Sequence, residues 1–247
     1  MDAHGVSDCL RYAFPPNSLH YCGPEKQADI RGYLETHTQD RGLHGILSQF
    51  ETLYPYLQLI AGSNSIKDQF DRRVVEAYWI GNRLLSNVPK REFHSYLVDT
   101  LEVRKKFSKN GSGMMDGIMT FGLPHHTFHV LTIYVRTGNM AIAHTLHTMD
   151  SCRIGWGKVI SSDEKKGTYT ISMSHLVMRG NALVLDIPIP TTVRSVDGIY
   201  HEGDPVSVHW WYICGTLTKR QITNLEHFTK EAIAAANTMH STEHIQS

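Results

Sequence analysis

The chain has 247 residues, and its 24 aspartate and glutamate side chains balance its 24 lysine and arginine side chains. Because balanced charge gives no broad electrostatic field, nucleic acid and anionic membranes are not expected as partners. The longest apolar runs, such as residues 130–135, are much shorter than a membrane span, and the N-terminus lacks the charged-then-apolar layout of a signal peptide. These features predict a cytoplasmic protein with no membrane segment.

The length is sufficient for one large domain or two modest ones, with a core that needs no disulfides. The four cysteines are widely spaced, which is typical of a reducing compartment where thiols are free for metals or for chemistry. Histidine is unusually frequent, with 16 in the chain. We treat a histidine as a candidate ligand only where it clusters with other ligand types.

The first 24 residues contain three prolines and several aromatic residues, a composition that predicts an ordered, irregular loop packed on a domain. His20 and Cys22 lie in this stretch and could complete a metal or cofactor pocket at a domain interface. The alternative is that Cys22, like many cysteines, is a small apolar residue of the core.

Residues 25–85 carry apolar side chains at helical spacing and predict several helices, interrupted by a turn at 62–65. Pro89 fits the first turn of a further helix that ends at the glycine-rich residues 110–113. Residues 122–135 are rich in strand-forming residues, yet their helical surroundings favour a helix. Residues 139–148 predict the last helix of this half.

Two pairs of histidines in these helices have the spacing of metal ligands. His125 and His129 would share one helix face at positions i and i+4, without the glutamate of the zinc-protease pattern. The alternative is that His125 caps the helix and His129 packs in the core. His147 lies close to Cys152 in sequence and could join it in a site, or could instead favour the negative end of the helix dipole.

Beyond Cys152 the apolar period changes to two, as in Tyr169, Ile171 and Met173, and further strand-like runs follow at 182–187, 192–196 and 206–212. A capping box at 218–221 then opens an amphipathic helix. The sequence therefore predicts an α+β protein with a mainly helical domain at 1–150. A small antiparallel β-barrel with a C-terminal helix is predicted at 151–247.

The C-terminal part carries two motifs in order, CRIGWGKV at residues 152–159 and GDPVSVH at residues 203–209. With the terminal helix that follows, they resemble the HypC/HybG/HupF family of nickel–iron hydrogenase maturation chaperones, which have a small OB-like barrel. The helical part resembles at most an uncharacterised prokaryotic family. The resemblance implies that Cys152 and His209 hold an iron centre with cyanide and carbon monoxide ligands while it is built and delivered. Trp156 stands where that family has proline, and we include it with His20 and Cys22 as a candidate cofactor contact.

The sequence therefore suggests a protein of hydrogenase maturation whose partners are other maturation proteins or the hydrogenase large subunit. A soft thiolate and an imidazole suit iron. The metal candidates are Cys152, His209, His125, His129 and His147. Two alternatives stay open, which are a metal-dependent enzyme using iron or zinc at a histidine-rich helical site, and a metal-free interaction module. Whether the chain forms a homo-oligomer is also left open.

Overall fold

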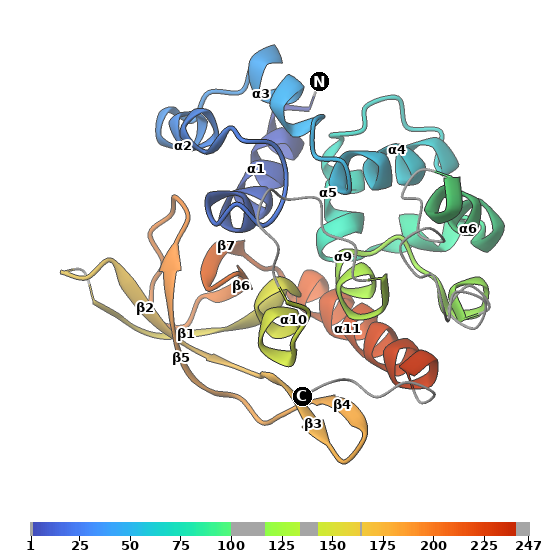
Figure 1. Cartoon of the computed structure of the whole chain (residues 1–247). Coiled ribbons are helices and arrows are strands. Elements are labelled where there is room, and N and C mark those ends of the chain that lie inside the picture. The colour runs from blue at the N-terminus through green and yellow to red at the C-terminus, as the bar shows by residue number, and fades with distance from the viewer. Residues whose placement is uncertain (1, 100–116, 134–142, 164, 241–247) are drawn as a thin grey trace.

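The computed structural model describes residues 2–99, 117–133, 143–163 and 165–240. The protein is α+β, with helices in the N-terminal half, a closed five-stranded β-barrel and a long C-terminal helix (Figure 1). Within the described residues, no helix has both the length and the hydropathy needed to cross a bilayer.

The N-terminal half is built from short helices, as the apolar spacing predicts. Aspartate side chains cap several of them; Asp40, for example, accepts a hydrogen bond from the amide of Leu43 at 3.0 Å. The helix predicted to follow Pro89 is present as well, while the turn predicted at 110–113 lies outside the described residues. The elements are α1 (Ala3–Ser18), α2 (Gln27–Thr36), α3 (Arg41–Leu47), α4 (Leu53–Ser63), α5 (Arg72–Trp79), the 3-10 helix η1 (Arg83–Asn87) and α6 (Lys90–Asp99).

Helix α1 corrects the prediction of a proline-rich N-terminal loop. Asp2 caps its first turn, and Val6, Leu10 and Ala13 are buried in the core along one face. The two prolines, Pro15 and Pro16, fall in the last turn, where each removes one amide donor without breaking the docked helix. Proline content favours a loop in this segment, but burial of the apolar face of α1 determines the fold.

The middle of the chain is helical where it is described. Residues 117–121 form a helical segment, and α9 (His126–Phe128) continues directly into a π-helical turn, η2 (His129–Ile133). The helix predicted for 122–135 is confirmed over 126–133, whereas residues 122–125 are not helical, and neither are residues 143–145 of the helix predicted for 139–148. Residues 134–135 and 139–142 lie outside the described residues. Helix α10 (Leu146–Cys152) begins at a capping box formed by Thr145 and Thr148, and it extends further than the predicted end at residue 148.

The strands form a closed barrel in the order β1-β2-β5-β7-β6, in which only the β5–β7 pair is parallel. The predicted alternation is confirmed, because Ile171 and Met173 point into the small barrel core together with Val206 and Val208. The barrel strands are β1 (Gly155–Asp163), β2 (Thr168–Met173), β5 (Ile189–Ser195), β6 (Pro205–His209) and β7 (Tyr212–Thr216), and β3 (Leu176–Arg179) with β4 (Ala182–Leu185) form a separate hairpin.

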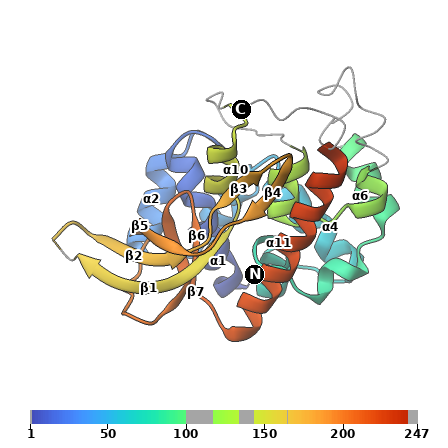
Figure 2. The same cartoon turned by 90° about the horizontal axis from the view of Figure 1, so that it is seen from below.

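The larger hydrophobic core extends across the predicted domain boundary at residue 150. Helix α11 (Lys219–His240) packs against α9 and η2 of the helical half. Figure 2 shows α11 on the side of the helices, with strands β1, β2 and β5 away from it. Residues from both halves, including Phe14, Ile154, Trp210 and Leu225, belong to one buried cluster. The end of the barrel that carries His209 therefore faces the helices, and Cys152 lies at the end of α10 just before the first barrel strand.

Candidate metal centre

Three buried side chains converge at the junction of helices and barrel. His126 comes from the start of α9, Cys152 from the end of α10 and His209 from the end of β6. One ligand atom from each residue lies within 4.8 Å of the other two. The three side chains are 7%, 8% and 1% exposed, so bulk water is largely excluded from all of them. This His–Cys–His cluster can hold one metal ion.

His209 is oriented by a backbone carbonyl of α1. Its Nδ1 lies 2.7 Å from the carbonyl oxygen of Tyr12, and because a carbonyl only accepts, Nδ1 carries the hydrogen. The lone pair of His209 is then on Nε2, which is the atom available to a metal. Histidine ligands in proteins are commonly fixed in this way by a bond to the opposite ring nitrogen.

Cys152 is positioned by a buried ion pair beside it. The Asp150 carboxylate bonds to the guanidinium of Arg153, with Nε–O and N–O distances of 2.9 and 2.8 Å, and Arg153 is 1% exposed. The same carboxylate accepts the amide of Leu176 at 2.8 Å and binds Nδ1 of His175 at 2.7 Å. These bonds attach the end of α10 to strand β3 and the segment before it. A ligand on such a supported helix end has little freedom to move.

The turn that follows His209 is strained and closes over the cluster. Trp210 and Trp211 have φ angles of +48° and +64°, a conformation that L-residues other than glycine and asparagine seldom adopt. The amide of Trp210 donates to the carbonyl of Ser151 at 2.7 Å, which joins the turn to α10. The Trp210 ring packs on Tyr21 with ring centroids 4.9 Å apart. Backbone strain of this kind is concentrated at functional sites.

His126 is held on both sides of its ring. Its Nε2 lies 2.8 Å from the carbonyl oxygen of Cys152, so Nε2 carries the hydrogen, and its Nδ1 lies 3.2 Å from the hydroxyl of Tyr78. Burial, together with the neighbouring His209, holds the pKa of His126 well below its usual range. A neutral imidazole is the form that binds a metal.

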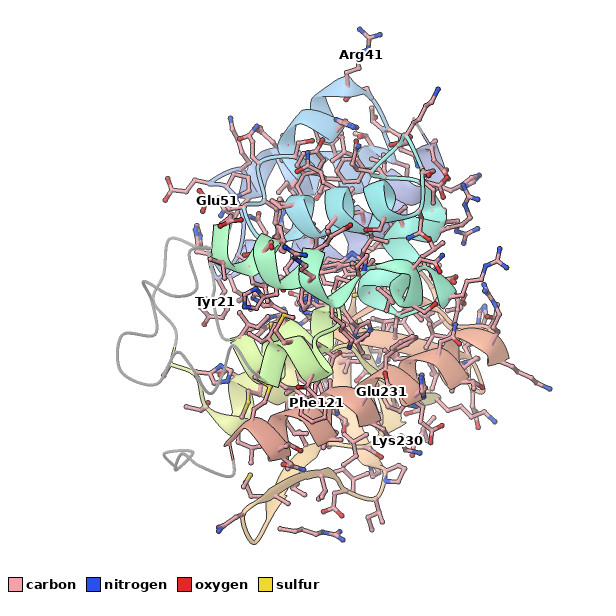
Figure 3. All side chains as sticks on the ribbon, turned by 90° about the vertical axis from the view of Figure 1, so that its right-hand side faces the viewer. Tyr21, Arg41, Glu51, Phe121, Lys230 and Glu231 are labelled. Carbon is pink, nitrogen blue, oxygen red and sulfur yellow. The ribbon has the colours of Figure 1, made fainter. Side chains whose placement is uncertain are left out.

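The cluster borders a narrow cavity with mostly apolar walls. The space open to the centres of water-sized molecules is about 50 Å³, and one water needs ~10–15 Å³ on this measure, so only a few small molecules fit. Tyr21, one of the lining residues, lies between the helices of the N-terminal half and the yellow-green helices in Figure 3. Besides the three clustered residues, the lining side chains that can bind metals are Cys22, His129 and His144.

The structure brings together the pair that the family resemblance implied, Cys152 and His209, and adds His126, which the sequence analysis missed. The two histidines proposed on either side of it, His125 and His129, do not belong to the cluster. His129 lines the cavity and bonds to the hydroxyl of Tyr56 at 2.8 Å. His125 is buried elsewhere, where burial lowers its pKa to about 3.

A break in helical geometry explains this difference. His125 precedes α9 with an extended backbone (φ −118°, ψ 139°), so it does not share a helix face with His129. His126 is the first residue of the helix and therefore directs its ring toward Cys152. The sequence signal that could have identified His126 is its place after Pro124 and His125, where a helix start is expected.

The remaining candidates lie in different surroundings. Cys22 lines the cavity, whereas His20 is exposed after α1 and Trp156 is a half-buried residue of β1 outside the cavity wall. His147 is exposed on α10 and stacks on Trp211, with ring centroids 5.9 Å apart. Of these four residues, Cys22 is the one that lines the cavity beside the cluster.

The fold and the site define an α+β protein with a buried candidate metal centre of two histidines and one cysteine. The chain matches the model of a family of unknown function, DUF6390, over residues 1–243, and it belongs to that family. No curated protein and no solved structure matches the chain.

The donor set fits a transition metal. Imidazole suits iron, zinc, copper and nickel, and thiolate selects softer ions, which excludes magnesium and calcium as natural occupants. Three protein donors leave at least one position of a four-coordinate ion for a non-protein ligand, as in catalytic rather than structural zinc sites. The cavity supplies the space for such a ligand.

Proposed function

We propose that the protein binds one iron ion through His126, Cys152 and His209 and handles it, with cyanide and carbon monoxide as further ligands, in the maturation of a nickel–iron hydrogenase. The observation that carries the proposal is the convergence of the three donor atoms within 4.8 Å. Two of these residues, Cys152 and His209, are the ones that the resemblance to the HypC/HybG/HupF family implies.

The surroundings of the cluster support small exogenous ligands. A diatomic molecule needs little more room than a water, and the narrow cavity admits only a few molecules of that size. Its walls are largely apolar, and a dry surrounding favours carbon monoxide and protects a bound complex from exchange with water. A five-stranded barrel that carries His209 and begins three residues after Cys152 is also compatible with the OB-like barrel that the resemblance implies.

Delivery of iron to a partner requires that the buried cluster opens. Two aromatic residues of the cavity lining, Tyr21 and Trp210, are in ring contact and join the loop after α1 to the turn after β6. A hydrogenase large subunit or another maturation protein that displaces this pair would reach the metal. The proposed partners therefore act on the face that carries Tyr21.

A metal-dependent enzyme, with iron or zinc, is the second candidate. It is favoured by one observation, which is that the metal cluster opens onto an internal cavity able to hold a small substrate. A helical site formed by His125 and His129 away from Cys152 is not the basis of this candidate, because the cavity that includes His129 also includes Cys152. A metal-free module would not need three possible donor atoms within 4.8 Å of one another.

The test is anaerobic purification, with and without co-expression of a hydrogenase maturation system, followed by metal analysis and infrared spectroscopy. We expect about one iron per chain and stretching bands of bound cyanide or carbon monoxide. Cys152→Ala should lose both signals, whereas the control Cys214→Ala, at a buried thiol outside the cavity, should keep them.

Three other results would each change the conclusion. Zinc at one ion per chain without infrared bands would favour the enzyme candidate. Iron that persists in Cys152→Ala would place the metal elsewhere. Protein that binds neither metal, even after co-expression, would contradict the proposal.

A further inference from the structure

Tyr78 is the side chain that connects the candidate metal cluster to the cavity. It lies on α5, is 2% exposed and lines the cavity together with His126 and Cys152. Its hydroxyl is 3.2 Å from Nδ1 of His126. No part of the family resemblance includes this residue, because it belongs to the helical half.

The tautomer of His126 determines what the Tyr78 hydroxyl does without a metal. Nε2 of His126 donates its hydrogen to the carbonyl of Cys152, so Nδ1 carries the lone pair. The Tyr78 hydroxyl therefore donates to Nδ1. In this tautomer a metal ion that binds His126 takes the Nδ1 lone pair, and the Tyr78 hydroxyl then loses this acceptor.

A buried hydroxyl without an acceptor is unfavourable, so it reorients to any acceptor that the cavity offers. A ligand on the cavity side of the ion is adjacent to Tyr78. In metal sites, hydrogen-bond donors on the open side control which small ligands bind.

We propose that Tyr78 donates a hydrogen bond to the exogenous ligand of the metal and thereby selects anionic diatomic ligands over neutral ones. The inference rests on the proposed function, since it needs a metal at the cluster. The nitrogen end of cyanide is a good acceptor, whereas the oxygen end of carbon monoxide is a poor one. Tyr78 thus stabilises cyanide and leaves carbon monoxide unaffected.

The experiment compares the two ligands on anaerobic protein loaded with ferrous iron. Cyanide and carbon monoxide are titrated separately into the parent, Tyr78→Phe and the control Tyr96→Phe, with infrared detection of the C≡N and C≡O stretches. Tyr96 belongs to the same aromatic group, its buried hydroxyl has no hydrogen-bond partner among the described residues, and it does not line the cavity.

We expect Tyr78→Phe to shift the C≡N band and to raise the Kd for cyanide about 3- to 10-fold, the usual effect of one hydrogen bond. The C≡O band and the Kd for carbon monoxide should not change, and Tyr96→Phe should match the parent for both ligands. In metal-free protein, the 15N shifts of His126 should show Nδ1 losing a hydrogen bond in Tyr78→Phe.

Two outcomes would overturn the inference while leaving iron binding intact. The first is an unchanged cyanide band and affinity in Tyr78→Phe. The second is an equal change for cyanide and carbon monoxide, which would mean that Tyr78 acts through the Cys152 sulfur or the metal itself. Failure of the parent to bind iron would instead contradict the proposed function, and the inference would fail with it.

Discussion

Pro16 and His209 are linked through one carbonyl group. In a regular helix the carbonyl of Tyr12 would accept the amide of residue 16, but proline has no amide hydrogen. The Tyr12 oxygen instead accepts Nδ1–H of His209 at 2.7 Å. The proline that made α1 hard to predict therefore leaves free the acceptor that fixes the tautomer of a candidate metal ligand.

The first prediction is that Pro16→Ala weakens metal binding although it improves the helix. Alanine restores an amide that competes with His209 for the Tyr12 carbonyl, so part of the His209 population loses its fixed orientation. Loss of an outer hydrogen bond to a metal ligand typically lowers metal affinity about 10- to 100-fold, and we expect the lower end because a carbonyl can accept two bonds. Competition titration with a chelating indicator measures the affinity.

Pro15→Ala is the matched control for this prediction. It restores an amide in the same turn, but the amide faces the carbonyl of Arg11, which does not bond to His209. Equal affinities of the two variants would show that the Tyr12 carbonyl does not orient His209.

The second prediction separates the two residues of the strained turn. Trp210→Gly removes a buried ring that lines the cavity, and large-to-small substitutions of aromatic core residues cost about 3–5 kcal/mol. Trp211→Gly relieves a positive φ while removing a less buried ring, so the free energy of unfolding should change by less than about 1 kcal/mol. Urea unfolding measures both. A larger loss in Trp211→Gly would mean that its stacking on His147 outweighs the backbone strain.

The third prediction concerns the carboxylate next to Cys152. Asp150→Asn leaves the guanidinium of Arg153 buried without its counter-ion, which typically destabilises a protein by about 3–5 kcal/mol. It should also weaken metal binding, because the end of α10 is then less firmly held. As a control, Asp163→Asn removes an exposed ion pair with Lys166 and should leave urea unfolding and metal affinity unchanged.

The fourth prediction is a loss of stability of the metal-free protein in mild acid. Burial lowers the pKa of His125 to about 3 and keeps that of His126 well below its usual range. Below pH ~6.5 the unfolded chain binds protons at both residues while the folded chain does not. The stability present above pH 6.5 is therefore lost as the pH falls toward the folded-state values, by roughly 1.4 kcal/mol per pH unit and per histidine.

Urea unfolding at several pH values between 7.5 and 5 measures this slope. His125→Gln should lower the dependence of the unfolding free energy on pH by the contribution of one histidine. His4→Gln, at an exposed residue, is the control for the substitution itself. A slope that is unchanged in His125→Gln would contradict the assignment of a depressed pKa to His125.

The sequence predicts best those helices and strands in which buried residues recur at a regular spacing. Alternation at Ile171 and Met173 identified the barrel strand β2, and the spacing of Leu53 and Leu57 identified a helix. The sequence does not predict helix α1, because the three prolines and the aromatic residues of the first 24 residues favour an irregular loop. In the folded protein its apolar face is buried, and this outweighs the two lost backbone bonds.

The candidate site was predictable only in part, for a geometric reason. Cys152 and His209 were named from a resemblance that covers the barrel, and that resemblance carries no information about the helical half. His126 enters the cluster because α9 begins at that residue and not one position earlier, and a shift of one position rotates a side chain by about 100° around a helix. Sequence spacing does not determine a helix start to that accuracy.

Because the hydrophobic core is shared, we do not expect the two halves of the chain to be soluble as separate fragments. Ile154, Trp210 and Leu217 belong to the same buried cluster as side chains of the first half, so we expect a fragment beginning at residue 151 to expose apolar surface. Such a fragment should aggregate when expressed alone, and co-expression with residues 1–150 as a separate chain should rescue its solubility. The shared core thus predicts that the barrel and the helices fold together.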